Sequence, residues 1–138
     1  MKHIFNHKVF YSDTDAYGVV WHGSYLRWLE MGRVYLCEMM GYNLVELEKN
    51  DIVMPVTNIN IRYKASAKLN DELIIETYIS KVTPLSITFT QTVSDKNTNK
   101  LFIIAAIDVV SINKEGKLYR RFPDFLKDVF EGALECNV

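Results

Sequence analysis

The chain lacks the features that mark small secreted or membrane-spanning proteins. It has only two cysteines, Cys37 and Cys136, which form no spacing motif, so we expect two reduced thiols and no disulfide framework. The longest wholly apolar run, residues 101–107, is far shorter than the ~20 residues that a membrane-spanning helix requires. The first residues are interrupted by Lys, Asn and His and lack the apolar core of a signal peptide. We therefore expect a cytoplasmic protein without membrane insertion.

An excess of charge of either sign is also missing. The chain has 16 Lys and Arg residues against 17 Asp and Glu residues, a formal net charge of −1. Such a balance gives no general attraction to nucleic acid, so we expect no nucleic-acid partner. An anionic ligand would have to be held by local groups. Few basic residues are candidates for contacting phosphate groups, namely Arg62, Lys64, Lys68, Arg120 and Arg121. Basic residues of this kind usually form only a solvent-exposed surface.

Several familiar catalytic and metal-binding patterns are absent as well. The chain has no serine-centred elbow, no phosphate-cradling glycine loop and no CxxC pair. His3 and His7 lie four residues apart on a predicted strand without a third ligand nearby, so we expect no metal site. His22 and Cys37 are separated by a continuous predicted helix that spans about 22 Å, too far for a catalytic dyad. No metal and no cofactor are expected.

The order of hydrophobic patterns predicts a single α+β domain over residues 1–138. One strand and one long helix come first, followed by four or five antiparallel strands and a closing helix. The predicted strands are residues 3–12, 57–64, 73–79, 86–94 and 101–112, with a short one at 118–120. The predicted helices are residues 22–40 and 123–134, and residues 44–49 are predicted as a short helical or irregular piece.

The long helix is the element around which we expect the chain to fold. Its apolar residues spread well beyond one stripe, which is typical of a helix buried on several sides. Gly41 supplies a C-terminal stop, and Gly32 would allow close packing.

Residues 101–112 form the most apolar segment and suit a strand buried on both faces. The helix also carries a Glu with an Arg three residues to either side, a spacing that permits ion pairs: Arg27, Glu30 and Arg33.

Two carboxylates precede this helix, Asp13 and Asp15, in a loop over residues 13–21. An Asp in a turn commonly accepts hydrogen bonds from its own backbone, and we assign that structural role to Asp13. Around Asp15 the neighbours are apolar and aromatic, which would desolvate the carboxylate and raise its basicity toward that of a general base. These neighbours are Tyr11, Tyr17, Val19, Val20 and Trp21.

The start of the helix supplies the second component of a candidate site. The first N–H groups of a helix lack partners within the helix and carry partial positive charge. If the helix begins at His22, these amides can receive the oxyanion that forms when an acyl carbonyl becomes tetrahedral. Gly23 lowers the steric cost of bringing a substrate close to this backbone. The alternative is an ordinary helix start in which Ser24 acts as a cap.

Residues 11–30, YSDTDAYGVVWHGSYLRWLE, closely resemble the signature of the 4-hydroxybenzoyl-CoA thioesterase family, including its YbgC-like acyl-CoA thioesterases. The later stretches MPV (54–56), IRY (61–63) and DEL (71–73) fit the family too. The resemblance implies a hotdog fold, in which a sheet wraps a long central helix. Residues 83–85 depart from the pattern, because they lack the basic cluster with which the 4-hydroxybenzoyl-CoA enzyme contacts CoA phosphates. Residues 64–67 also replace a Pro-Ala pair common in the family.

The resemblance implies the roles of particular residues. It places the catalytic carboxylate at Asp15, as nucleophile or general base, and the amide that polarises the thioester carbonyl at His22. It implies an acyl-CoA substrate, no cofactor, and a homodimer or homotetramer with active sites at subunit interfaces. The residues expected to contact substrate lie in or beside the loop: Tyr17, Gly18, Val20, Trp21 and Tyr25.

Two other functions remain open from the sequence. A hotdog thioesterase can act on acyl carrier protein instead of CoA, which requires a basic docking surface near the pocket. A hotdog protein can also bind acyl-CoA without hydrolysing it. A hotdog dehydratase is disfavoured, because no His–Glu pair suited to that chemistry stands out.

Overall fold

The computed structural model describes residues 1–135. The strands are β1 (Lys2–Lys8), β2 (Val56–Tyr63), β3 (Glu72–Val82), β4 (Ser86–Asp95) and β5 (Leu101–Val110). The helices are α1 (Ser24–Met39), α2 (Leu44–Lys49) and α3 (Asp124–Ala133), with a single 3-10 turn, η1, at Tyr11–Asp13. Cys136, the second of the two predicted thiols, lies outside the described residues.

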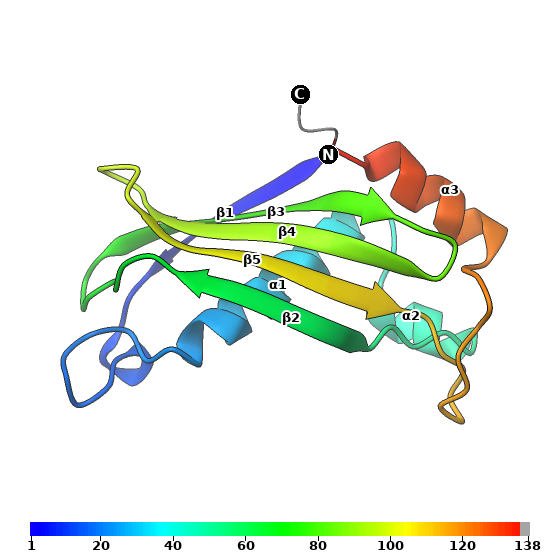
Figure 1. Cartoon of the computed structure of the whole chain (residues 1–138), viewed down its shortest axis with the longest axis horizontal. Coiled ribbons are helices and arrows are strands. Elements are labelled where there is room, and N and C mark those ends of the chain that lie inside the picture. Colours follow the sequence, from blue (N-terminus) through cyan, green and yellow to red (C-terminus); the bar gives the residue numbers. More distant parts are fainter. Residues whose placement is uncertain (136–138) are drawn as a thin grey trace.

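The five strands form one antiparallel sheet in the order β1-β3-β4-β5-β2. Figure 1 shows α1 running along the face of the sheet that is turned away from the viewer, with the loop of residues 13–21 at one end and α2 at the other. The predicted α+β arrangement, a sheet around one central helix with a C-terminal helix, is confirmed.

Alternation along the strands decides which side chains meet α1. From residue 73 to residue 79 in β3 and from residue 87 to residue 93 in β4, every second residue is buried and the residues between them are half-exposed. The buried row packs against the apolar side of α1, and together they form one hydrophobic core. The largest fully buried side chains of this core on the helix and on β3 and β4 are Trp28, Tyr25, Leu29, Leu36, Leu73, Ile75, Ile79 and Ile87.

A buried polar cluster fixes α1 on the sheet around Gly32. A Cβ added to Gly32 would overlap the Thr77 hydroxyl and lie 3.0 Å from Gln91 Nε2, so only glycine allows this close approach. Gln91 Nε2 donates to the Leu29 carbonyl and to Thr77 Oγ1, each at 2.7 Å. Arg33 Nη1 donates to Gln91 Oε1 at 3.1 Å. The packing role predicted for Gly32 is therefore confirmed.

Replacing this glycine should destabilise the fold. We expect Gly32→Ala to lower the free energy of unfolding by about 1–3 kcal/mol, because the added methyl group overpacks the site. Gly132, in α3, has open space around its Cα, and Gly132→Ala should raise the free energy of unfolding by up to about 1 kcal/mol. Urea unfolding of the two variants checks this. Equal effects of the two substitutions would contradict the packing argument.

Two predicted strands differ from the structure. β1 ends at Lys8 and not at residue 12, because the chain turns into η1, where the Asp13 carboxylate accepts the Phe10 N–H. Residues 118–120 form no strand, and Leu118 makes only a single bridge with Ile112. This segment follows the tight turn at residues 113–117 and ends before a ladder can form.

Burial of α1 and β5 also differs from the prediction. The side of α1 away from the sheet is open, with Leu26, Tyr35 and Met39 exposed, so the helix is buried on one side and not on several. β5 is buried on its inner face and half-exposed on its outer face. Its apolar character reflects its place inside the sheet, between β4 and β2. Within residues 1–135 no helix has the length and apolar character needed to cross a membrane.

Candidate active site

Asp13 holds the base of the loop at residues 13–21. Its side chain is buried, and Oδ2 accepts the Phe10 N–H at 2.9 Å and lies 3.0 Å from His7 Nε2. Oδ1 accepts from Arg27 Nη2 at 3.1 Å, and the Asp13 carbonyl accepts the Trp21 N–H at 2.8 Å. The structural role predicted for Asp13 is confirmed, and it extends to β1 and α1.

Asp15 is the first residue of a tight turn over residues 15–18. Its Oδ1 accepts the Tyr17 N–H at 2.8 Å, its carbonyl accepts the Gly18 N–H at 3.0 Å, and its own N–H donates to the Val19 carbonyl at 2.9 Å. Gly18 has φ +79°, a left-handed conformation that glycine adopts without strain. Oδ2 accepts no hydrogen bond from residues 1–135. The turn therefore fixes Oδ1 of the carboxylate. Oδ2 stays available to interact with a bound molecule.

The start of α1 presents two unbonded amides. The helix begins at Ser24 with Gly23 as its N-cap, two residues later than predicted. Among residues 1–135, nothing accepts a hydrogen bond from the N–H of His22 or of Gly23. Ser24 Oγ donates to the Asp13 carbonyl at 3.0 Å and caps no helix N–H, so the capping alternative is wrong. The Gly23 N–H, at the N-cap of α1, carries the partial positive charge of a helix N-terminus, and the His22 N–H precedes it in the turn that leads into the helix.

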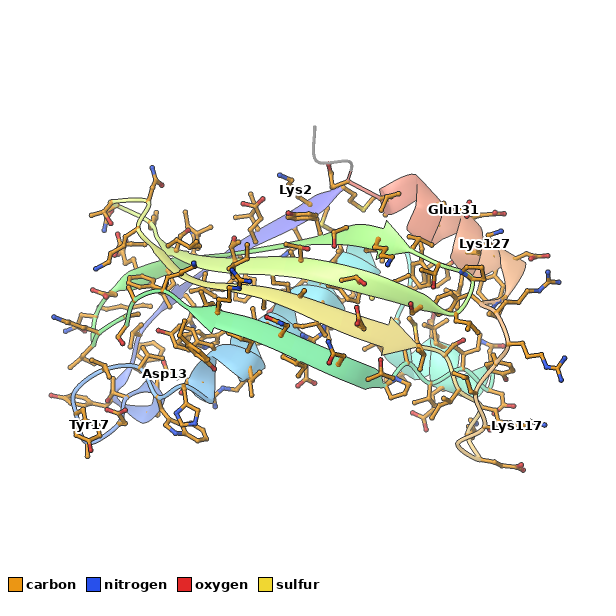
Figure 2. All side chains as sticks on the ribbon, viewed as in Figure 1. Lys2, Asp13, Tyr17, Lys117, Lys127 and Glu131 are labelled. Atoms are coloured by element: carbon orange, nitrogen blue, oxygen red, sulfur yellow. The ribbon has the colours of Figure 1, made fainter. Side chains whose placement is uncertain are left out.

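The aromatic side chains of the loop do not close over Asp15 within one chain. Tyr17 is 91% exposed and Trp21 is 51% exposed. Figure 2 shows Tyr17 at the outer end of the loop and Asp13 nearer to its base. The Trp21 indole lies against Gly23, where a Cβ would overlap the ring. The desolvating wall predicted around Asp15 therefore requires a further surface, and substrate contact by Tyr17, Gly18 and Trp21 stays a prediction.

Val20 and Tyr25 are buried in the core of the chain. The Val20 N–H donates to the Ala67 carbonyl at 2.8 Å, and the Tyr25 hydroxyl accepts the Ala67 N–H at 3.1 Å. Burial raises the pKa of the Tyr25 hydroxyl above its ordinary value. In this chain both residues fasten the loop to the segment before β3. Their predicted contact with substrate also stays a prediction.

Sequence reasoning missed Tyr63, at the end of β2. Its hydroxyl donates to the His22 carbonyl at 3.1 Å, and its ring lies edge-on to Tyr25 at a centroid distance of 5.8 Å. Desolvation raises the pKa of the Tyr63 hydroxyl. Its alternation with Ile59 and Ile61 indicated only a half-buried strand. The contact with His22 could not be predicted, because the two residues are 41 positions apart in the sequence.

An apolar cavity of about 300 Å³ lies between the second half of α1, α2 and the inner face of the sheet. Cys37, Val56, Phe89 and Val109 contribute to its lining, and Glu30 and Arg33 also border it. None of the predicted substrate-contacting residues borders it. Sequence reasoning missed the cavity because its walls come from several elements.

The cavity region contains no reactive thiol. Burial raises the pKa of the Cys37 thiol to about 11, so it is neutral near pH 7 and a poor nucleophile. The ion pairs that the spacing of Arg27, Glu30 and Arg33 permits do not form. Arg27 pairs instead with Asp13, and Arg33 donates to Gln91. Within residues 1–135 no three side chains cluster in a way that would hold a metal ion.

Comparison with known sequences identifies the family. The sequence profile of the Thioesterase-like superfamily matches residues 9–130. The acyl-CoA thioester hydrolase YbgC of Escherichia coli O6:H1 is 32% identical over 106 residues, which cover 77% of this chain and 78% of that protein. The acyl-CoA thioesterase YbgC of Haemophilus influenzae is 39% identical over 85 residues, 61% of this chain and 62% of that protein.

Solved structures agree at the level of the fold. The structure of Slr0204, a 1,4-dihydroxy-2-naphthoyl-CoA thioesterase from Synechocystis, matches with a TM-score of 0.84 over 94% of this chain and 96% of that chain. Its sequence identity is 19%, so this likeness supports the hotdog fold alone. The family resemblance inferred from residues 11–30 is confirmed. The chain belongs to the Thioesterase-like superfamily.

Proposed function

We propose that the chain is an acyl-CoA thioesterase, which hydrolyses an acyl- or aroyl-CoA to the free acid and CoA. The proposal rests on the family and on one observation, the placement of a carboxylate in the turn that leads to unbonded amides at the start of α1. A single carboxylate can suffice because a thiolate is a good leaving group. CoA enters the reaction as part of the substrate, the acyl-CoA thioester, so no separate cofactor is required.

Asp15 has two possible roles in this reaction. As general base it takes a proton from water while the water oxygen bonds to the thioester carbon. As nucleophile it bonds to that carbon itself, forming an anhydride that water then hydrolyses. On either route the C–S bond breaks and the CoA thiolate takes up a proton. The His22 N–H donates to the carbonyl oxygen as negative charge develops there, an interaction whose loss elsewhere typically costs ~2.7–4 kcal/mol.

One chain does not bring the acid and the cavity together. Asp15 precedes α1, whereas Val34 and Cys37, which line the cavity, lie in its second half. At 1.5 Å per residue, Val34 is about 15 Å along the helix from Ser24. An acyl group in this cavity would leave its carbonyl far from the amides of the same chain. A shared site between two copies resolves this separation.

A second copy fits along β2. This strand is at the edge of the sheet, pairs with β5 alone among the strands of residues 1–135, and exposes Val56, Ile59 and Tyr63. An exposed apolar edge strand readily pairs with another chain, and a two-fold dimer uses the same surface on both partners. Antiparallel pairing of β2 with its copy places the Tyr63 end of one strand beside the Val56 end of the other. Because Tyr63 contacts His22 and Val56 lines the cavity, the helix start of one copy would meet the cavity of the other.

The remaining parts of the proposal follow from this dimer. The second copy would cover the open side of the loop and desolvate Asp15, as the sequence predicted. Two dimers can associate further into a homotetramer. We retain one domain over residues 1–138 and a cytoplasmic location, which the free, buried Cys37 supports.

A thiol-release assay tests the function. We expect the purified chain to release CoA from some aliphatic or aromatic acyl-CoA, with cleavage of the matched acyl carrier protein substrate much slower. Faster cleavage of the carrier-protein substrate would instead assign the chain to the acyl-carrier-protein thioesterases. Saturable binding of acyl-CoA without thiol release across the panel would contradict hydrolysis.

A further inference from the structure

Tyr63 connects the edge strand to the start of the central helix. Its hydroxyl donates to the His22 carbonyl at 3.1 Å, across 41 positions in the sequence. Its ring is held edge-on against Tyr25, which is itself fixed by the Ala67 N–H at 3.1 Å. The phenol is therefore oriented by the core on one side and bonded to the helix start on the other.

This contact fixes a peptide group and not only a carbonyl. A trans peptide is planar, and its C=O and N–H point in opposite directions. Residues 1–135 contain no cis peptide bond, so orienting the His22 carbonyl also orients the Gly23 N–H. The Trp21 indole lies against the Cα of Gly23 and restricts the same peptide from the side. The Gly23 N–H itself has no acceptor within residues 1–135.

We propose that Tyr63 is a positioning residue that aims the Gly23 N–H at the reacting carbonyl, as a second oxyanion donor beside the His22 N–H. The inference rests on the proposed thioesterase function and adds to it a donor and the side chain that orients it. A hydrogen bond into the His22 carbonyl also polarises the peptide, which makes the Gly23 N–H a stronger donor. Two donors would share the charge that develops on one oxygen.

Tyr63→Phe removes the hydroxyl and keeps the ring against Tyr25. We expect kcat to fall about tenfold, which corresponds to about 1.4 kcal/mol of transition-state stabilisation. KM should change less than kcat, because the donor bonds weakly to the neutral carbonyl of the bound substrate and more strongly to the negative charge that develops in the transition state. Tyr119→Phe is the matched control, since the Tyr119 hydroxyl donates to the Asp51 carbonyl at 2.7 Å in another part of the fold. It removes the same kind of bond and should leave kcat unchanged.

A spectroscopic readout separates positioning from stability. In the Asp15→Asn background turnover should be at least about 100-fold slower, so a thioester labelled with ¹³C at its carbonyl can be observed while it is bound. Donation from the two amides should lower its carbonyl stretching frequency relative to free substrate. Adding Tyr63→Phe should reverse part of that shift, while adding Tyr119→Phe should not.

The outcomes are distinguishable. If wild type releases thiol, and Tyr63→Phe keeps the wild-type kcat and carbonyl frequency, the positioning role is overturned while the thioesterase function stands. If kcat falls equally in Tyr63→Phe and Tyr119→Phe together with thermal stability, Tyr63 is merely structural and the inference is also overturned. If wild type releases no thiol from any substrate, the proposed function and this inference fall together.

Discussion

Asp15→Asn should lower kcat by about 10²–10⁴-fold, the range that a positioned general base or its equivalent contributes. Asn is nearly the same size and can accept the Tyr17 N–H through its own Oδ1, so the turn should persist. The amide can neither take a proton from water nor attack the carbonyl. The loss should appear in kcat with little change in thermal stability, measured by thiol release and by thermal unfolding.

Asp95→Asn is the matched control. Asp95 Oδ1 also accepts backbone N–H groups in a tight turn, those of Asn97 at 2.8 Å and Thr98 at 3.0 Å. It is the last residue of β4, beside the β4–β5 turn, so this substitution should leave kcat unchanged. Wild-type turnover by Asp15→Asn would remove Asp15 from the mechanism.

Ile59→Asp should convert the proposed dimer into a monomer and abolish most activity. Ile59 is 44% exposed at the centre of β2, where a second copy would bury it. Burying an unpaired carboxylate in an apolar interface costs several kcal/mol, enough to shift association by orders of magnitude. Light scattering should show a mass near 16.0 kDa in place of twice that value. Thiol release should fall in parallel, because each active site would lose the cavity that the second copy contributes.

Ile4→Asp controls for the loss of an exposed isoleucine. Ile4 is 57% exposed on β1, at the opposite edge of the sheet. This variant should remain dimeric and active. A dimeric, fully active Ile59→Asp protein would show that the site is complete without pairing along β2.

Most of the fold was predictable because local patterns encode it. The alternation in residues 57–64 and 86–94 matches β2 and β4 within one residue, and the piece at residues 44–49, predicted as helical or irregular, is the helix α2. The start of α1 was misplaced because a turn over His22 and Gly23, closed by the Ser24 N–H donating to the Trp21 carbonyl, precedes the first helical residue. Helical periodicity does not reveal such a turn.

The candidate site was predictable only where it is local in sequence. Asp15 and the amide of His22 are seven residues apart and form one motif, so a single stretch of chain indicates both. Tyr63 and the cavity come from contacts between distant segments, which no spacing reveals before the sheet is built. The side of α1 that faces away from the sheet was mispredicted for a similar reason. Its apolar residues indicated burial on several sides, but within one chain they are exposed.

A crystal structure of the Asp15→Asn variant bound to an acyl-CoA that wild type hydrolyses tests the central claim most directly. We expect the thioester carbonyl oxygen to lie about 2.7–3.1 Å from the His22 or Gly23 nitrogen, with the substituted side chain at position 15 beside the carbonyl carbon and the acyl group in the cavity of the second copy. A carbonyl oxygen bound away from both amides in every subunit would contradict this arrangement.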